Sequence, residues 1–242
     1  MAAERVCRIA VVIPTLDEEG AIGPLLRELP RTVVGRAIVC DGGSRDGTRT
    51  EAEAAGATVI AAGRGYGRAC LLGAEAAAEA AIVVFMDGDG ADDPGEIAAL
   101  VQPILAGTHD FVIGSRVRGV REPGAMLWHQ LAAGRAAGLA IRLLYGARYT
   151  DMCAFRAIRR DALLALGMRE TTYGWNVEMQ MRAARSGLRI LEVPVRCRRR
   201  TAGSSKVTGS IRGTLRAGSR IAMTILRIAA DRGPPPIAQE SR

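Results

Sequence analysis

An apolar segment that ends in closely spaced aspartates is the feature that most constrains this chain. Residues 81–86 form a continuous apolar run of the length of one buried strand. The carboxylates of Asp87, Asp89, Asp92 and Asp93 follow it directly. Neighbouring carboxylates at a strand end repel each other unless a cation lies between them, and hard oxygen ligands suit Mg²⁺ or Mn²⁺. The segment therefore predicts a divalent-cation site, with a solvated acidic turn as the alternative.

The rest of the chain alternates short apolar runs with helical patterns. We expect strands at residues 8–13, 36–40, 58–61, 110–113 and 190–195, and helices at 21–29, 48–55, 95–105 and 127–145. An alanine-rich helix to residue 79 follows the glycine loop at residues 63–67. This alternation predicts an α/β fold with a mainly parallel, Rossmann-like sheet flanked by helices.

Composition narrows the class of function. A net charge of +8 over 242 residues suits a phosphorylated substrate, an anionic membrane surface or a nucleic acid. Aromatic residues make up only 4% of the chain, which argues against the base-stacking platforms of nucleic-acid binders. Five scattered cysteines indicate a reducing compartment, and Arg5 and Arg8 interrupt any N-terminal signal peptide. We therefore expect a cytoplasmic protein that does not bind nucleic acid.

Several expected strands end in glycine or aspartate, and parallel strands bring such ends to one edge of the sheet. A nucleotide there would meet residues 14–18, Asp41, the glycine loop and the Asp87/Asp89 pair. The loop does not match a dinucleotide fingerprint, because Gly65-x-Gly67 is followed by Cys70 where a third glycine is required. A dehydrogenase is therefore disfavoured.

Together these motifs resemble family 2 glycosyltransferases of the GT-A fold, in particular the polyprenyl-phosphate (dolichol-phosphate) mannosyl- and glucosyltransferase branch. The resemblance runs from about residue 9 to about residue 218 and uses separated motifs. These are the opening strand and loop at 12–18, the Asp-Gly-Gly-Ser-x-Asp-Gly-Thr segment at 41–48, the glycine loop, Asp87-Gly88-Asp89, Gly114-Ser115-Arg116 and Ser205-Lys206.

The resemblance implies a set of site residues. Asp87 and Asp89 would hold Mg²⁺ or Mn²⁺. Asp89, Arg116 and Glu178 would be catalytic, with Glu178 as the base if the acceptor is a hydroxyl; a solvated or capped helix residue is the alternative for Glu178. An acceptor phosphate would need no such base. The nucleotide sugar would contact Pro14, Leu16, Glu18, Asp41, Gly67, Asp87, Gly88, Arg200 and Lys206. Asp151 would contact the sugar or order its turn, and Tyr173 would line the acceptor entrance.

Two positions depart from the family pattern. Gly42 replaces the second aspartate of the Asp-Asp-Gly-Ser signature, and Ala91 stands where a glutamine can face the metal. The metal then rests on Asp87, Asp89, phosphate oxygens and water, or Asp92 substitutes for the glutamine. The choice between GDP and UDP stays open.

We expect a glycosyltransferase domain over residues 1–210, a basic amphipathic helix over 211–232 and a disordered tail over 233–242. The helix either packs on the domain or lies on an anionic membrane. The expected activity is inverting transfer of a hexose from a GDP- or UDP-linked sugar to polyprenyl phosphate at the inner face of the cell membrane, in cell envelope biosynthesis. The alternatives are transfer to a hydroxyl of a glycolipid or soluble acceptor, and a non-catalytic nucleotide- or membrane-binding module.

Overall fold

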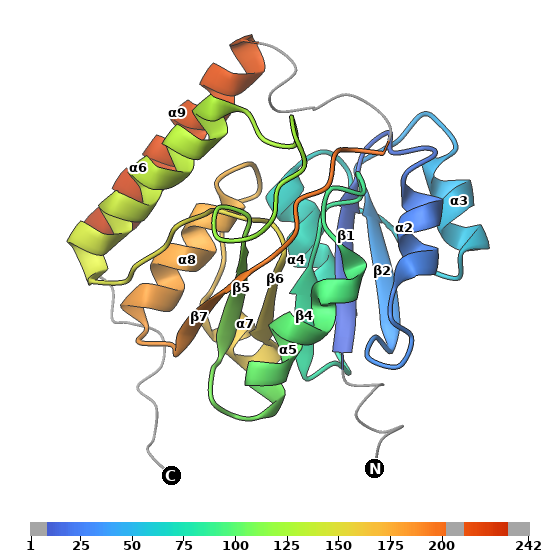
Figure 1. Cartoon of the computed structure of the whole chain (residues 1–242), viewed down its shortest axis with the longest axis horizontal. Coiled ribbons are helices and arrows are strands. Elements are labelled where there is room, and N and C mark those ends of the chain that lie inside the picture. Colours follow the sequence, from blue (N-terminus) through green and yellow to red (C-terminus); the bar gives the residue numbers. More distant parts are fainter. Residues whose placement is uncertain (1–8, 202–210, 232–242) are drawn as a thin grey trace.

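The protein is described from a computed structural model that covers residues 9–201 and 211–231, with the side chains of residues 211–217 left aside. One sheet runs through the described part of the chain, in the strand order β3-β2-β1-β4-β6-β5-β7 (Figure 1). Its strands are β1 (Ile9–Thr15), β2 (Arg36–Asp41), β3 (Thr58–Ala61), β4 (Ile82–Phe85), β5 (Phe111–Ser115), β6 (Arg156–Arg159) and β7 (Ile190–Pro194).

Helices cover both faces of the sheet. They are α2 (Ile22–Glu28), α3 (Thr48–Ala54), α4 (Tyr66–Ala76), the 3₁₀ turn η1 (Pro94–Glu96), α5 (Ile97–Leu105), α6 (Trp128–Tyr145), α7 (Arg160–Ala165), α8 (Trp175–Arg185) and α9 (Ile211–Ala230). Helix α4 packs on β1 and β2, and α5 packs on β4, β5 and β6. Figure 1 shows α5 in front of the sheet and α4 behind it. The predicted α/β fold is confirmed.

The sheet is mainly parallel, as predicted, but β6 runs against both of its neighbours. Strands β1, β2, β3 and β4 pair in parallel, and so do β5 and β7. Strand β6 lies between β4 and β5 and is antiparallel to each. Residues 150–155 form an irregular connection that leads into β6.

The strands of the sheet contribute mostly buried apolar side chains to the core. Strand β4 is buried along its whole length, which explains why its sequence is uninterrupted by polar residues. Trp175 at the start of α8 is 1% exposed and meets Phe85 edge to face, with ring centroids 6.1 Å apart. Trp175 is therefore a core residue. The four described cysteines are free and buried, as expected of small hydrophobic residues.

Helix α9 packs on the domain through one face. Ile221 and Ile225 are half-buried, Thr224 and Ile228 are buried, and the helix contacts α8. Met223 and Leu226, on the other side, are 52% and 69% exposed. The predicted C-terminal helix is present, and it packs on the domain while keeping an exposed apolar face. Residues 202–210 and 232–242 lie outside the described residues.

Candidate active site

A cavity of about 460 Å³ lies at the carboxyl ends of the parallel strands. Figure 1 shows these strand ends at the top of the sheet. It is lined from the strand ends, the glycine loop, the acidic turn and the C-terminal segments. The lining residues are Pro14, Thr15, Leu16, Glu18, Gly42, Arg64, Gly65, Tyr66, Ala69, Asp87, Gly88, Asp89, Thr172, Tyr173, Arg200 and Arg220. Residues from most of the predicted motifs thus meet in one pocket.

Asp87 and Asp89 lie in the turn that follows β4, and both line the cavity. The hydroxyl of Tyr66 donates to Oδ1 of Asp87 at 3.1 Å. Oδ1 of Asp89 accepts from the backbone N–H of Ala91 at 2.9 Å, which fixes the carboxylate in the turn. Arg200 Nη2 lies 2.8 Å from Oδ2 of Asp89. Both carboxylates therefore border the same cavity, from which a cation can reach them.

The electrostatics of this pair fit a divalent cation. Burial, and then repulsion from Asp89, raise the pKa of Asp87 to about 6. A cation between the two carboxylates would relieve that repulsion. Among the described residues no group of three or more acidic, histidine or cysteine side chains could hold an ion. Two carboxylates are what Mg²⁺ commonly takes from a protein when substrate phosphates supply further ligands.

Asp92 does not join this pair. It is buried, and its Oδ2 accepts from the backbone N–H of Asp87 at 3.1 Å. Burial, and then the charge of Asp87, raise its pKa to about 8. Asp92 is not among the residues that line the cavity. The structure therefore does not support Asp92 as a third metal ligand and gives it a role in holding the turn.

The affinity for Mn²⁺ is expected to fall with pH below about 6. The cation needs an ionised Asp87, and the raised pKa leaves that carboxyl protonated at pH values where an ordinary aspartate is charged. Below the pKa, proton competition should weaken Mn²⁺ binding by about tenfold per pH unit. Titration by electron paramagnetic resonance at pH 5 to 8 measures this. In Tyr66→Phe, which removes a hydrogen bond that lowers this pKa, the fall should begin at higher pH; an unchanged curve would contradict the assignment.

The loop after β1 is fastened to the loop after β2. Backbone N–H groups of Asp17 and Glu18 donate to the hydroxyls of Ser44 and Thr48 at 2.9 and 2.8 Å. Asp17 takes a positive φ of 52°, which an aspartate tolerates in a tight turn. This fastening holds Pro14, Leu16 and Glu18 at the cavity, as predicted from the resemblance.

Asp41 is not among the cavity-lining residues, although it was predicted to contact the nucleotide. It is 2% exposed, and its carboxylate accepts from the backbone N–H groups of Gly43 and Ser44 and from the hydroxyl of Ser44. Gly42 lines the cavity instead. An added Cβ at Gly42 would lie 3.1 Å from the carbonyl oxygen of Thr15, so the two loops approach closely there. Asp41 thus shapes the turn that presents Gly42.

Gly67 is a packing position of the glycine loop. An added Cβ would lie 2.2 Å from the backbone oxygen of Glu170, which is too close for any side chain. Gly65, at φ 131°, and Tyr66 line the cavity, whereas Gly67 does not. Gly67, which was predicted to contact the nucleotide, thus lies where the loop packs closely on residues 170–171.

Gly67→Ala is expected to destabilise the protein by about 1–3 kcal/mol, because the new methyl group must displace backbone. Thermal or urea unfolding measures the change. Gly134→Ala is the matched control, because Gly134 is also helical and an added Cβ there meets nothing within 4 Å. The control should be neutral or slightly stabilising. Equal stability of the two variants would contradict the packing role.

Arg116 does not line the cavity and forms a bidentate pair with Asp151. Its Nε and Nη2 lie 2.9 and 2.8 Å from the two carboxylate oxygens. The pKa of Asp151 is lowered, because the hydrogen bonds and charge of Arg116 outweigh its burial. The positive charge of Arg116 also lowers the pKa of Asp87 and so partly offsets the effect of burial on that carboxyl group. Arg116, which was predicted to contact a phosphate, is thus held by Asp151 and is not among the residues that line the cavity.

Glu178 was predicted as a candidate catalytic base, and the structure corrects this. Its side chain is fully buried and does not line the cavity. One oxygen accepts from the backbone N–H groups of Arg169 and Glu170, and the other pairs with Arg182 at 2.9 Å. A carboxylate enclosed in this way cannot reach an acceptor hydroxyl. Glu178 is a structural anchor of the loop before α8.

Arg200 reaches the acidic turn because the segment after β7 hydrogen-bonds to that turn. The backbone N–H of Arg198 donates to the carbonyl of Ala91 at 2.8 Å, and that of Thr201 donates to the carbonyl of Asp89 at 3.0 Å. The predicted position of Arg200 in the site is thus observed. Lys206, the other predicted basic residue, lies outside the described residues.

Comparison with known proteins assigns the fold and site to a family. The profile of "Glycosyl transferase family 2" matches residues 10–167, which is more than half of the chain. The chain belongs to glycosyl transferase family 2. The predicted family is therefore confirmed.

Relatives of this glycosyltransferase include two enzymes with named activities. An undecaprenyl-phosphate mannosyltransferase of Micrococcus luteus is 33% identical, over 85% of this chain and 90% of its own. A polyprenol monophosphomannose synthase of Mycolicibacterium smegmatis is 30% identical, over 84% and 82%. An uncharacterized glycosyltransferase of Mycobacterium tuberculosis is 36% identical, over 86% and 93%.

Solved structures confirm the GT-A fold. Glucosyl-3-phosphoglycerate synthase of Mycobacterium tuberculosis, in complex with Mn²⁺, UDP-glucose and phosphoglyceric acid, matches with a TM-score of 0.74 and 25% identity. The match covers 96% of this glycosyltransferase and 84% of the synthase. The same synthase has also been solved with Mg²⁺ and UDP.

The polar cavity residues that were not predicted as individual site residues include Arg64, Tyr66, Thr172 and Arg220. Arg64 and Tyr66 lie inside the glycine loop that was predicted to meet the nucleotide, so their position in that loop indicated that they could line the site. Tyr173, predicted to line the acceptor entrance, does line the cavity. Arg220 gave no such signal, because only the packing of α9 brings it to the pocket.

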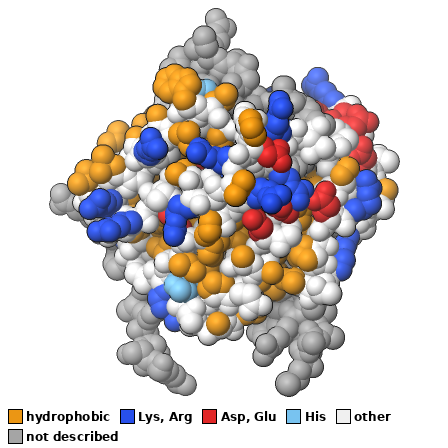
Figure 2. Space-filling model, viewed as in Figure 1, with side chains coloured by type: hydrophobic (Ala, Val, Ile, Leu, Met, Phe, Trp, Pro, Cys, Tyr) orange, Lys and Arg blue, Asp and Glu red, His pale blue; other side chains and the backbone are white. Residues whose placement is uncertain are grey.

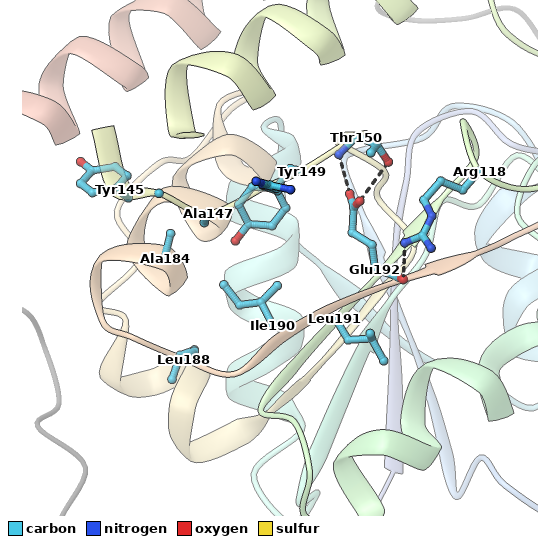
Figure 3. A pocket seen from close by; sticks show the side chains of 12 residues that line it. Arg118, Tyr145, Ala147, Tyr149, Thr150, Ala184, Leu188, Ile190, Leu191 and Glu192 are labelled. Carbon is cyan, nitrogen blue, oxygen red and sulfur yellow. Dashed lines mark hydrogen bonds between the residues drawn. The ribbon is translucent and has the colours of Figure 1, made fainter. Parts of the chain in front are cut away.

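A second cavity, of about 600 Å³, lies beside β7 and the ends of α6 and α8 (Figure 3). Glu192 is its one acidic lining residue, and this carboxylate accepts from the backbone N–H and hydroxyl of Thr150 at 2.8 and 2.9 Å. Arg118 donates to the backbone carbonyl of Glu192. Because the described residues bring no carboxylate pair to this cavity, they form no cation site there comparable to Asp87 and Asp89.

Proposed function

We propose that this glycosyltransferase is an inverting, divalent-cation-dependent enzyme that transfers a hexose from a nucleoside diphosphate sugar to the phosphate of a polyprenyl phosphate. The observation that carries the proposal is the Asp87/Asp89 pair, which shares its pocket with three arginines, Arg64, Arg200 and Arg220. Relatives named as polyprenyl-phosphate mannosyltransferases, and the Mn²⁺ and UDP-glucose complexes of a structural neighbour, support it.

The donor's pyrophosphate fits beside the acidic pair. Asp87 and Asp89 would hold Mg²⁺ or Mn²⁺, which when bound acts as a Lewis acid on the leaving nucleoside diphosphate. Arg200 now neutralises Asp89, and with a cation in place its guanidinium is available to the donor phosphates. The loop at Pro14–Glu18 and Gly42 also line the cavity, and the nucleoside would lie against them.

The transfer is a single displacement. An oxygen of the acceptor phosphate forms a bond to C1 of the sugar, and the bond from C1 to the β-phosphate oxygen breaks. The nucleoside diphosphate departs with the electron pair. An acceptor phosphate is already anionic, so this reaction needs no general base. The burial of Glu178 away from the pocket is consistent with that requirement.

A lipid acceptor also suits the exposed surface of α6 and α9. Trp128 and Leu143 of α6 are 79% and 78% exposed, and Arg135 and Arg142 are exposed on the same helix. Figure 2 shows hydrophobic and basic side chains interspersed at the upper left, where α6 lies in Figure 1. In the described part of the chain no helix is long and apolar enough to cross a membrane. We place the enzyme at the inner face of the membrane, bound peripherally through these helices.

Liposome flotation tests the membrane surface. Trp128→Ser with Leu143→Ser should reduce binding to vesicles containing anionic lipid. Leu164→Ser is the matched control, because Leu164 is 52% exposed on α7, which does not belong to this surface. Equal flotation of all variants would remove the peripheral placement.

The decisive experiment screens nucleotide sugars by thermal shift with and without Mn²⁺, and then assays radiolabelled transfer to undecaprenyl phosphate. We expect a metal-dependent shift with one donor, transfer to the lipid phosphate, and inversion at C1 by nuclear magnetic resonance of the product. The phosphoglyceric acid complex of the structural neighbour makes a soluble phosphorylated acceptor the second candidate. Metal-independent binding without transfer to either acceptor would favour a non-catalytic module.

A further inference from the structure

Helix α9 forms part of the wall of the active-site cavity. Arg220 lines the cavity together with Thr172 and Tyr173 of the loop before α8. Arg220 stands between the packed face of α9 and its exposed apolar face, one turn before Thr224 and three residues before Met223. The C-terminal helix therefore does more than cover the domain, because it brings a guanidinium to the mouth of the site.

A buried polar network fixes α9 at this position. The hydroxyl of Thr224 lies 3.0 Å from Oε2 of Glu170 and 2.8 Å from the backbone oxygen of Arg220. Arg227 lies 3.5 Å from Glu170 and 3.4 Å from Glu178. Glu170 and Thr224 are nearly fully buried, so these contacts set the rotation and height of the helix.

The same network extends to the loop 170–173 and to the glycine loop, which also line the cavity. Glu170 accepts from the backbone N–H of Thr172 at 3.0 Å and from its hydroxyl at 2.6 Å. The carbonyl of Thr171 accepts from the N–H of Arg68, at the start of α4, at 3.0 Å. Helix α9, the loop 170–173 and the glycine loop are thus one connected unit around the pocket.

The pocket's arginines differ in their partners. Arg200 pairs with Asp89 on the donor side. None of the ion pairs within the described ranges involves Arg220, which is exposed at the cavity. Met223 and Leu226 continue from Arg220 along the exposed side of α9. A phosphate held by Arg220 would therefore leave an attached hydrocarbon chain against an apolar surface.

We propose that Arg220 binds the phosphate monoester of the acceptor, and that Thr224 positions it by holding α9 on Glu170. This inference rests on the proposed function and names a residue for its acceptor side. A guanidinium can bind a phosphate through paired hydrogen bonds, which suits a dianionic monoester at the pocket mouth. A prenyl phosphate and a small phosphorylated acceptor share this chemistry.

Calorimetric titration of the full chain, with Mn²⁺ and nucleoside diphosphate present, tests the phosphate contact. The probes are geranyl phosphate, 3-phosphoglycerate and, as the uncharged control, geraniol. Arg220→Gln should weaken binding of the phosphate probe by about 10- to 100-fold, the usual loss for a hydrogen bond to a charged group. Arg49→Gln, which removes an exposed arginine of α3, should bind like the parent. Binding of the donor and of Mn²⁺ should stay within about twofold in both variants.

The arms of the titration separate the two acceptor sources. If Arg220→Gln weakens binding of geranyl phosphate alone, Arg220 recognises the phosphate of a lipid. If it weakens binding of both phosphate probes, Arg220 recognises the phosphate group whatever is attached to it. Equal affinity of Arg220→Gln and the parent, or no binding of either phosphate by the parent, overturns the inference. Because binding is read without turnover, a failure of transfer in the parent would count against the proposed function alone.

The positioning role of Thr224 has its own test. Thr224→Val removes the hydroxyl at nearly constant volume, and we expect it to weaken phosphate-probe binding several-fold. Thr224→Ser, which keeps the hydroxyl, should restore it. If Thr224→Val lowers the melting temperature but leaves phosphate binding unchanged, Thr224 is structural only and the positioning claim is wrong.

Discussion

Asp89→Asn is expected to lower the turnover number by at least about 1,000-fold while leaving the fold intact. A bound divalent ion contributes several kcal/mol of charge stabilisation in the transition state, and each ~1.4 kcal/mol is a factor of ten in rate. The amide oxygen of asparagine can still accept the hydrogen bond from Ala91 that now fixes Asp89 in the turn. The loss should therefore come from the missing charge and not from a disordered turn.

Measurement of Asp89→Asn needs both a rate and a metal titration. The transfer rate should fall together with Mn²⁺ affinity, whereas circular dichroism and the melting temperature without metal should stay close to the parent. Glu53→Gln, an exposed carboxylate of α3, is the matched control and should keep full turnover. Full turnover in Asp89→Asn would refute the metal site.

Glu178→Gln is expected to destabilise the protein by about 3–5 kcal/mol, because removing one partner of a buried ion pair leaves the other uncompensated. Arg182, the partner, is only 12% exposed in its side chain. Glutamine also cannot satisfy both sides, since one carboxylate oxygen meets backbone N–H groups and the other meets a guanidinium. For a chain of this size the melting temperature should fall by roughly 10 °C.

Turnover separates this structural role from catalysis. Loss of a general base costs about 100- to 10,000-fold in rate. We expect Glu178→Gln, assayed well below its melting temperature, to lose less than about tenfold. Glu79→Gln, exposed at the end of the helical region after the glycine loop, should match the parent in both measurements. A parental melting temperature with a hundredfold loss of turnover would restore the catalytic reading of Glu178.

The sequence was most informative where a single segment determined both structure and chemistry. The apolar run before Asp87 predicted a buried strand, and the parallel order of β1, β2 and β4 brought Pro14, Gly42 and the acidic pair to one edge. These positions follow from local pattern and from the rule that parallel strands share an edge. The pocket around Asp87 and Asp89 was therefore predictable before the structure.

Residues whose roles depend on tertiary partners were not predictable in this way. Glu178 and Arg116 match family motifs, yet their side chains pair with Arg182 and Asp151. Arg116 and Asp151 belong to separate segments of the chain, so nothing local in the sequence indicates their pairing. Glu178 and Arg182 stand at i and i+4 on α8, but the burial that makes this pair structural depends on tertiary packing. Strand β6 was also missed, because arginines at both of its ends hide a buried strand; Arg156 is fully buried over the ring of Phe111.

The antiparallel strand β6 has a consequence for the order in which the protein can be built. β4 and β5 do not pair with each other, because β6 lies between them, and β5 pairs with β7 along its other edge. A nascent chain that stops before Arg156 therefore leaves the edges of β4 and β5 that face β6 unpaired, and open strand edges are prone to pairing with other chains. The centre of the sheet can close only after β5, α6 and then β6 have been synthesised. The central strand β6 is therefore available only late in translation.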